Sequence, residues 1–306
     1  MSSSRRIPFC VLDSFTDTPF QGNPAGVFID DRGELTGEEM RHMAGEVSLE
    51  SGFVLPDDTG GAHDFRLRYF TGVMEVPLCG HATLAAVTAL VLAGRVAVPG
   101  ALRFAIAPGT ISAEFRQDAS GGLSVTQFQR APEFGDSLPT ADVAEVADAL
   151  GCAPSAVTAT GLPVRVVSTG TPWLYVPVES RAAVDAAPAS FDAINTLSKR
   201  HSTFGVYLFA LETDADGSPA VWSRCFAPIA GLNEDPVTGS ASGGLGGYLW
   251  KHGILPHAGG AVTARQGFAG GRGGTAHIRV EAPDREVRTT AVTGQAVLIA
   301  EGSFAL

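Results

Sequence analysis

The sequence Asn233-Glu-Asp-Pro-Val-Thr-Gly-Ser-Ala-Ser-Gly-Gly-Leu245 places two carboxylates before a proline, followed by a run of small residues that leads into Tyr248-Leu-Trp250. This order is typical of a loop that runs into the N-terminus of a helix. The first N–H groups of a helix lack partners within it, so such an end attracts anions. The stretch therefore predicts a helix whose N-terminus can bind a negatively charged group.

The same pattern occurs earlier in the chain. Pro77-Leu-Cys-Gly-His-Ala-Thr83 matches Pro236-Val-Thr-Gly-Ser-Ala-Ser242, and the two prolines are 159 positions apart (236 minus 77). Upstream residues recur in the same order: Glu75 and Asp235 just before the prolines, and Arg68-Tyr-Phe-Thr71 and Arg224-Cys-Phe-Ala227 further back. A repeat on this scale predicts two similar halves, each a sheet wrapped around one apolar helix.

The repeated motifs have two interpretations. Two halves related by such a repeat would direct both helix N-termini into one cleft, where N–H groups and helix dipoles suit a carboxylate or a developing enolate. The alternative is that both motifs serve packing alone, because small residues let a helix lie close inside a sheet.

Composition and charge exclude several classes of function. The chain has 306 residues, a net charge of −11 and no cluster of lysine or arginine. Nucleic acid and anionic membranes are therefore not expected as partners, since both are recognised through basic surfaces. At this length two domains are the better expectation.

The cysteines and the N-terminus indicate a cytoplasmic protein. The four cysteines are scattered and lack the spacing of zinc ligands or of a disulfide framework. The residues from Met1 to Ile7 lack the apolar run of a secretory signal. Val76–Gly94 is the longest segment without Asp, Glu, Lys or Arg. Because it contains a proline, a glycine and a histidine, it predicts a buried core helix rather than a membrane span.

The remaining patterns predict many strands and few helices. Thr36-Gly-Glu-Glu39 is a capping box that predicts a helix to about Val47, after which Glu50 precedes an apolar strand at Gly52–Leu55. Glu286–Val292 and Ala296–Glu301 are predicted as two closing strands. No G-x-G-x-x-G turn follows a strand and no G-x-S-x-G elbow is present, which disfavours a nucleotide-binding domain and a serine hydrolase.

Several motifs along the chain carry a family resemblance. They are Asp13-Ser-Phe-Thr16, Gly22-Asn-Pro-Ala-Gly26, Glu50 before Phe53-Val54, Phe70-Thr71, Glu75 through Thr83, Phe226-Ala-Pro228, Glu234 through Ala241, Gln266-Gly267 and Val297–Gly302. With these motifs the chain resembles the PhzF-like (phenazine biosynthesis-like) family, relatives of diaminopimelate epimerase and proline racemase. The motifs span almost the whole chain, so they are specific for the family but not for a substrate.

The resemblance implies an α+β, diaminopimelate epimerase-like fold with two pseudo-symmetric domains, each a barrel-like sheet around a central apolar helix. It implies a first domain of residues 1–128 plus 288–306, which includes the returning C-terminal strand, a second domain of residues 129–287, and an active-site cleft between them. It also implies proton transfer without a cofactor or metal, a small carboxylate-bearing substrate, and a homodimer.

The resemblance also implies roles for individual residues. Glu50 matches the acid/base of the family, and His81, Asp235 and Ser240 match positions that hold the substrate or share in proton transfer. The remaining matched positions are the helix-start glycines Gly80 and Gly239, with Cys79 as a further candidate for the substrate site. We therefore predict Glu50 and Asp235 as catalytic and the others as substrate-binding.

The residues favour chemistry with a single base. Racemases of the wider superfamily use two facing cysteines, whereas the second motif here has Thr238 where the first has Cys79. A single carboxyl that moves a proton between two carbons needs a pKa raised by burial. The apolar residues around Glu50, namely Leu49, Phe53, Val54 and Leu55, predict such a rise.

The predicted function is a cofactor-independent isomerase that shifts a proton, and with it a double bond, in a small carboxylate-bearing metabolite. Two alternatives remain open. One is an amino-acid epimerase or racemase on the same fold that uses Cys79 with Asp235 or Glu50. The other is a non-catalytic protein that binds small acids.

Overall fold

A computed structural model describes residues 5–107, 109–119 and 121–306 of the chain. The contacts between residues divide the protein into two compact units. The first contains Met1–Phe128 and Thr293–Leu306, and the second contains Gln129–Val292.

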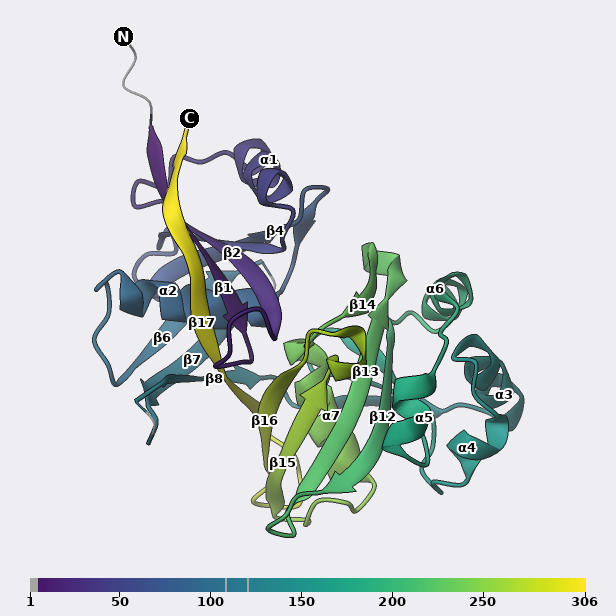
Figure 1. Ribbon diagram of the computed structural model, residues 1–306. Helices are drawn as coiled ribbons and strands as arrows, with labels where there is room; N and C mark the ends of the chain where they lie inside the picture. Colours follow the sequence, from purple (N-terminus) through teal and green to yellow (C-terminus); the bar gives the residue numbers. More distant parts are fainter. Residues whose placement is uncertain (1–4, 108, 120) are drawn as a thin grey trace. The chain divides into compact units, whose positions relative to one another are not determined.

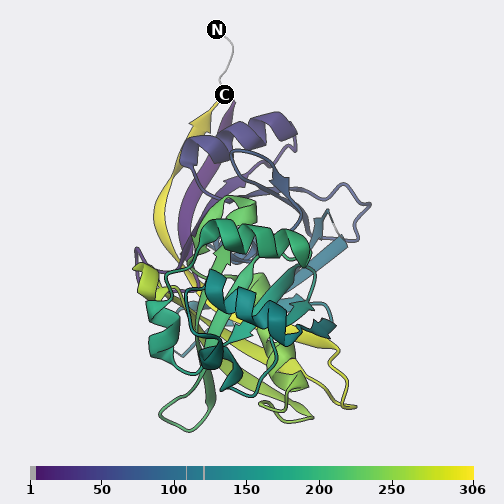
Figure 2. The same cartoon turned by 90° about the vertical axis from the view of Figure 1, so that its right-hand side faces the viewer.

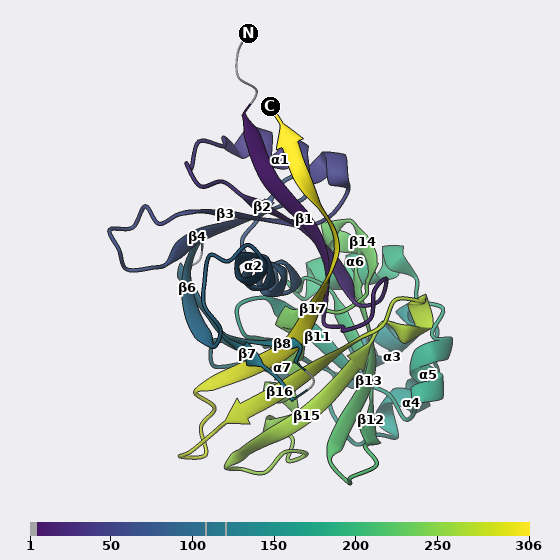
Figure 3. The same cartoon turned by 60° about the vertical axis from the view of Figure 1, so that its left-hand side comes forward.

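The first unit is a closed sheet around one helix. Its strands are β1 (Arg6–Ser14), β2 (Asn23–Ile29), β3 (Ser51–Pro56), β4 (Phe65–Phe70), β5 (Glu75–Val76), β6 (Gly100–Ile106), β7 (Gly109–Gln117), β8 (Leu123–Gln129) and β17 (Thr289–Ala305), the last of which begins in the second unit. β1 pairs with both β17 and β2, the chain of pairings continues through β3, β4, β6, β7 and β8, and β8 returns to β17. Figure 3 looks nearly along the enclosed helix α2 (Gly80–Leu92) and shows the strands around it.

Helix α2 forms the centre of this unit because its sequence is apolar on every side. All residues from His81 to Leu90 are buried. A helix that is apolar all round gains stability only when it is covered on all faces, which the closed sheet provides. The buried core helix predicted from Val76–Gly94 is therefore confirmed.

Helix α1 (Gly37–Val47) lies outside this sheet and has the predicted capping box. The Thr36 side chain accepts a hydrogen bond from the N–H of Glu39, and the Glu39 carboxylate accepts one from the N–H of Thr36. The helix ends at Ser48, whose left-handed backbone (φ 54°) turns the chain towards Glu50 and β3. The cap thus fixes where the helix begins, and the turn at its end fixes where Glu50 lies.

The second unit repeats the pattern with additional helices. Its strands are β9 (Glu133–Ser137), β10 (Arg165–Ser168), β11 (Pro172–Pro177), β12 (Val206–Thr213), β13 (Pro219–Ala227), β14 (Leu232–Asp235), β15 (Gly259–Gln266) and β16 (Gly274–Glu281). Its helices are α3 (Thr140–Ala149), α4 (Pro154–Thr158), α5 (Arg181–Ala186), α6 (Phe191–Arg200) and α7 (Gly239–Lys251), with short 3₁₀ turns at Pro228–Ala230 and Phe268–Gly270. Figure 1 shows α7 beside the strands of this unit and α3 to α6 gathered over β12 and β13, and Figure 2 faces those four helices.

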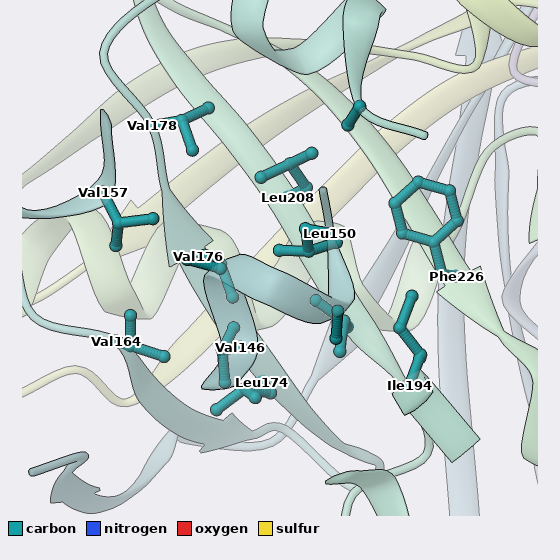
Figure 4. Packing of buried hydrophobic residues seen from close by; sticks show 14 of the residues in the cluster. Val146, Leu150, Val157, Val164, Leu174, Val176, Val178, Ile194, Leu208 and Phe226 are labelled. Carbon is teal, nitrogen blue, oxygen red and sulfur yellow. The ribbon is translucent and has the colours of Figure 1, made fainter. Parts of the chain in front are cut away.

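Strands β11 and β12 are buried on both faces, and their side chains alternate between two cores. Leu174 and Leu208 belong to the core that the strands share with α3 to α6, shown in Figure 4. Tyr175 and Tyr207 belong to the core on the α7 side. This alternation follows from the two-residue period of a strand, and it explains why β11 and the buried part of β12, Val206–Ala210, are apolar without interruption.

The repeat predicted from sequence is present in the strand pairings of both units. β2 and β3 are parallel, as are β11 and β12, and β4 pairs in parallel with β6 as β13 does with β15. The predicted fold class, two similar units that each contain a sheet around an apolar helix, is confirmed.

The arginines of the repeat make the same contacts in each unit. Arg68 Nε and Nη2 donate to Glu75, and Arg224 Nε and Nη2 donate to Glu234, at 2.7–2.8 Å. Each guanidinium also lies 4.9 Å from the ring centroid of the phenylalanine two residues on. The counterpart of Glu75 is therefore Glu234, and the sequence pairing of Glu75 with Asp235 was wrong by one residue.

One predicted boundary is also wrong. β17 runs without a break from Thr289 to Ala305, whereas two strands were predicted. A side chain at Gly294 would come within 2.5 Å of Phe15 and 2.9 Å of Leu84, so this glycine permits close packing rather than a turn. Across the described part of the chain, none of the helices combines the length and apolar character that a bilayer crossing requires.

Candidate active site

Glu50, Cys79 and His81 meet at the N-terminus of α2. Cys79 Sγ lies 3.8 Å from Glu50 Oε2, 3.4 Å from His81 Nδ1 and 3.7 Å from His81 Nε2. His81 Nε2 lies 3.6 Å from Glu50 Oε2. Cys79 and His81 are buried, while the Glu50 side chain is 20% exposed. The structure thus brings together three of the predicted site residues, a carboxylate, a thiol and an imidazole.

Local structure explains this meeting. Cys79 is the N-cap of α2 and His81 stands in its first turn, so both side chains lie where the helix begins. Glu50 immediately precedes β3, and its carbonyl accepts a hydrogen bond from the N–H of Gly26 on the parallel strand β2. The Glu50 carboxylate lies beside the polar side chains of Cys79 and His81, which its apolar sequence neighbours did not suggest.

The imidazole of His81 is neutral and oriented. Burial lowers the pKa of His81 to about 4, because a charged ring would lose its hydration. Asn23 Nδ2 lies 3.3 Å from His81 Nδ1, and when this amide donates to Nδ1 the ring proton is on Nε2. That proton then faces the Glu50 carboxylate.

The backbone at this helix start is held by residues from other strands. Gln127 Nε2 donates to the carbonyl of Gly80 at 2.6 Å, and Ser14 Oγ donates to the carbonyl of His81 at 2.8 Å. Ser14 and Asn23 lie inside motifs that carried the family resemblance, although no role had been predicted for them. The role of Gln127 could not be predicted from the local sequence, because its partner Gly80 is 47 residues away.

In the second unit, Asp235 belongs to a buried hydrogen-bond network at the start of α7. Thr238, the N-cap, donates from Oγ1 to Asp235 Oδ2 at 2.6 Å. Gln266 Nε2 donates to the carbonyl of Asp235 at 2.8 Å and to Thr238 Oγ1 at 3.0 Å, and Gln266 Oε1 accepts from the N–H of Thr238 at 3.1 Å. Gln266 belongs to a motif of the family resemblance, without a predicted role, and the structure makes it the centre of this network.

Gly239 and Ser240 form the first turn of α7. Gln129 Nε2 donates to the carbonyl of Gly239 at 2.8 Å, as Gln127 does to Gly80 in the first unit. Trp173 Nε1 donates to Ser240 Oγ at 3.2 Å. The structure therefore places Asp235, Gly239 and Ser240 together around one helix N-terminus.

The two helix starts have different chemistry. The N-cap of α2 is Cys79 and that of α7 is Thr238, and these two residues are 159 positions apart, as are the prolines of the repeat. The first start combines a carboxylate, an imidazole and a thiol, side chains that can accept or donate a proton. The second offers a hydroxyl, a carboxylate and helix N–H groups, which suit binding and orientation.

Two units that each contain a sheet around an apolar helix have the architecture expected of the diaminopimelate epimerase-like class of fold. Comparison with known proteins agrees. The family described as phenazine biosynthesis-like protein matches residues 12–302. A trans-2,3-dihydro-3-hydroxyanthranilate isomerase of Pseudomonas aeruginosa is 32% identical, over 96% of this chain and 98% of that protein.

Two further relatives support the same assignment. An uncharacterized isomerase, YddE of Escherichia coli, is 31% identical over 96% of this chain and 97% of its own length. The crystal structure of a PhzF-family phenazine biosynthesis protein of Bacillus anthracis has a TM-score of 0.86 and 27% identity, and covers 99% of this chain and 100% of that one.

The chain belongs to the phenazine biosynthesis-like (PhzF) family. It is an enzyme of the isomerase class, as its relatives are named. The family and the enzyme class predicted from sequence are both confirmed, and the alternative of a non-catalytic binding protein is set aside.

Proposed function

We propose that this isomerase moves a proton between two carbons of a small carboxylate-bearing metabolite, and that Glu50 is the general acid/base. The observation that carries the proposal is the position of the Glu50 carboxylate, 3.6 Å from His81 Nε2 and 3.8 Å from Cys79 Sγ. A neutral imidazole beside a carboxylate allows the carboxylate to accept a proton without a fixed positive charge that would hold it ionised.

The proposed reaction has two proton transfers. Glu50 removes a proton from a carbon next to an unsaturated bond, and the electron pair of that C–H bond moves into the conjugated system. The protonated carboxyl then returns the proton to another carbon on the same face, which shifts the double bond and regenerates the carboxylate. His81 Nε2–H donates a hydrogen bond to the negative charge that develops between the two steps.

The substrate class is supported by the helix N-termini and by the relatives. The first N–H groups of α2 point out of the helix start beside Glu50, and such groups favour a carboxylate. The Pseudomonas aeruginosa relative is named for the isomerisation of a hydroxyanthranilate derivative, which is a small carboxylic acid. For Asp235 and Ser240 we propose roles in holding the substrate, with Asp235 also assisting proton transfer.

Replacement of Glu50 tests the proposal. We expect Glu50→Gln to reduce kcat by about 10²–10⁴-fold, the usual contribution of a general acid/base, with far-ultraviolet circular dichroism unchanged. Glu46→Gln is the matched control, because Glu46 is an exposed glutamate on α1. Candidate acids would be incubated with each variant in D2O, and deuterium incorporation would be followed by mass spectrometry. Wild-type exchange rates in Glu50→Gln would refute the role of Glu50.

An epimerase that uses Cys79 is the second candidate, because the thiol lies 3.4 Å from His81 Nδ1 and can exchange a proton with the imidazole. It predicts deuterium at a stereocentre and a loss of exchange in Cys79→Ser. A symmetric two-thiol mechanism is not supported, because the counterpart of Cys79 is Thr238.

A further inference from the structure

The cluster at the start of α2 contains three different metal-binding groups. Glu50, Cys79 and His81 each offer one ligand atom, and these atoms all lie within 4.8 Å of one another. Thiolate, imidazole and carboxylate are the ligands that Zn²⁺ prefers in proteins. We propose that this cluster is an inhibitory binding site for Zn²⁺ or a similar thiophilic divalent cation.

The spacing of the three atoms fits a tetrahedral ion. Bonds of about 2.3 Å to sulfur, about 2.05 Å to nitrogen and about 2.1 Å to oxygen require separations of about 3.6 Å for S–N, about 3.6 Å for S–O and about 3.4 Å for N–O. The observed separations are 3.7 Å between Cys79 Sγ and His81 Nε2, 3.8 Å between Cys79 Sγ and Glu50 Oε2, and 3.6 Å between Nε2 and Oε2. The observed separations exceed the ideal values by about 0.1–0.2 Å, which small side-chain rotations can close.

Neighbouring groups would support a bound ion. When His81 binds a metal through Nε2, its proton lies on Nδ1, and a hydrogen-bond acceptor beside that atom orients the ring. Asn23, whose Nδ2 lies 3.3 Å from Nδ1, supplies such an acceptor when its amide turns to present Oδ1. Gln127 and Ser14 hold the carbonyls of Gly80 and His81, so the turn that carries two of the ligands is fixed.

Three protein ligands leave the fourth position of a tetrahedral ion for water or for a carboxylate of the substrate. A bound metal ion would take up the lone pair of the Glu50 carboxylate, which then could not accept a proton. Inhibition therefore rests on the proposed function of Glu50, whereas binding of the metal does not. Among the described residues, this is the one group of three such side chains found close enough to share an ion.

Co²⁺ tests the site, because a cobalt–thiolate bond gives a charge-transfer absorption in the near ultraviolet. We expect the wild-type protein to develop this band at one Co²⁺ per chain and Zn²⁺ to displace it. Cys79→Ser should abolish the band, and His81→Gln should weaken Co²⁺ binding at least about tenfold. Cys152→Ser is the matched control, because the half-buried Cys152 thiol donates to the carbonyl of Ala147 and is far from the cluster in sequence.

A second measurement needs no variant. Zn²⁺ should protect Cys79 from alkylation in the wild-type protein, as read by mass spectrometry of its peptide, and should inhibit the isomerase until a chelator is added. A missing charge-transfer band, or one that persists in Cys79→Ser, would overturn the metal site alone. A band that depends on Cys79, together with undiminished activity at saturating Zn²⁺, would overturn the inhibitory role and the assignment of Glu50.

Discussion

Replacing Gln266 with leucine should destabilise the second unit and disturb Asp235 at the same time. Gln266 is 1% exposed and makes three hydrogen bonds with Asp235 and Thr238. Leucine has a similar size, so the change removes the polar partner without leaving a large cavity. The N–H of Thr238 and the carbonyl of Asp235 each lose a partner in a buried place, at a cost of about 1–3 kcal/mol per group. Allowing for the apolar gain of leucine, we expect the free energy of unfolding to fall by about 2–4 kcal/mol.

Tryptophan fluorescence measures this unit selectively. The three tryptophans, Trp173, Trp222 and Trp250, all lie in the second unit. With a urea dependence of about 2 kcal/mol per molar, the expected loss lowers the urea midpoint by about 1–2 M. Ala261→Leu is the control, because Ala261 is exposed on the same strand, and its effect should stay within about 0.5 kcal/mol.

The same variant has a functional consequence. The network holds Asp235 through Thr238, so Gln266→Leu should also raise KM or lower kcat under conditions in which the protein remains folded. A midpoint shift no larger than that of Ala261→Leu would refute the stability argument. A normal midpoint with reduced turnover would instead show that Gln266 acts on the reaction rather than on folding.

Two further predictions follow from burial and charge. Arg224→Met should lower the free energy of unfolding by about 2–4 kcal/mol, because the side chains of Arg224 and Glu234 are only 13% and 21% exposed. Arg288→Met should cost under about 0.5 kcal/mol, because the side chains of Arg288 and Asp284 are 67% and 69% exposed. Equal effects of the two variants in urea titrations would contradict this prediction. All four tyrosines are buried and have a raised pKa, so alkaline absorbance titration should find them un-ionised in the folded protein at pH 11. Their contribution to the free energy of unfolding is complete below the unfolded pKa of about 10 and is lost as the pH rises from there towards the folded pKa. Ionisation of the folded protein near pH 10 would refute the prediction. These tyrosines are Tyr69, Tyr175, Tyr207 and Tyr248.

The parts of the fold that could be predicted depend on local signals. The capping box at Thr36 is decided within four residues, and the uncharged run around α2 has to be buried wherever the rest of the chain lies. The internal repeat then predicted the architecture, because a buried helix inside a sheet in one half implies the same arrangement in the other half.

The parts that could not be predicted depend on contacts between distant segments. The single strand β17 was predicted as two strands, because the close packing at Gly294 against Phe15 and Leu84 involves residues far away in the sequence and leaves no mark in the local pattern. Asp235 was paired with Glu75 by order alone, although the repeat offset of 159 residues leads from Glu75 to Glu234, and the bonds of the arginines show that Glu234 is the counterpart. Gln266 and Asp235 are 31 residues apart in the sequence, so no local pattern around either residue predicts their hydrogen bond.

The contrast between the two helix starts supports our proposal that proton transfer takes place at the first one. In the second unit the N-cap hydroxyl of Thr238 already donates to Asp235 and accepts from Gln266, so its preferred partners lie within the protein. In the first unit the N-cap is a thiol, a weak hydrogen-bond donor, and its contacts with Glu50 and His81 at 3.4–3.8 Å are long. Protons at the second helix start can move only when this network of short, buried hydrogen bonds breaks, whereas the thiol, the imidazole and the carboxylate at the first start can pass a proton among themselves. The same three side chains are the ligands of the proposed metal site, so a site suited to proton transfer here would also be sensitive to zinc.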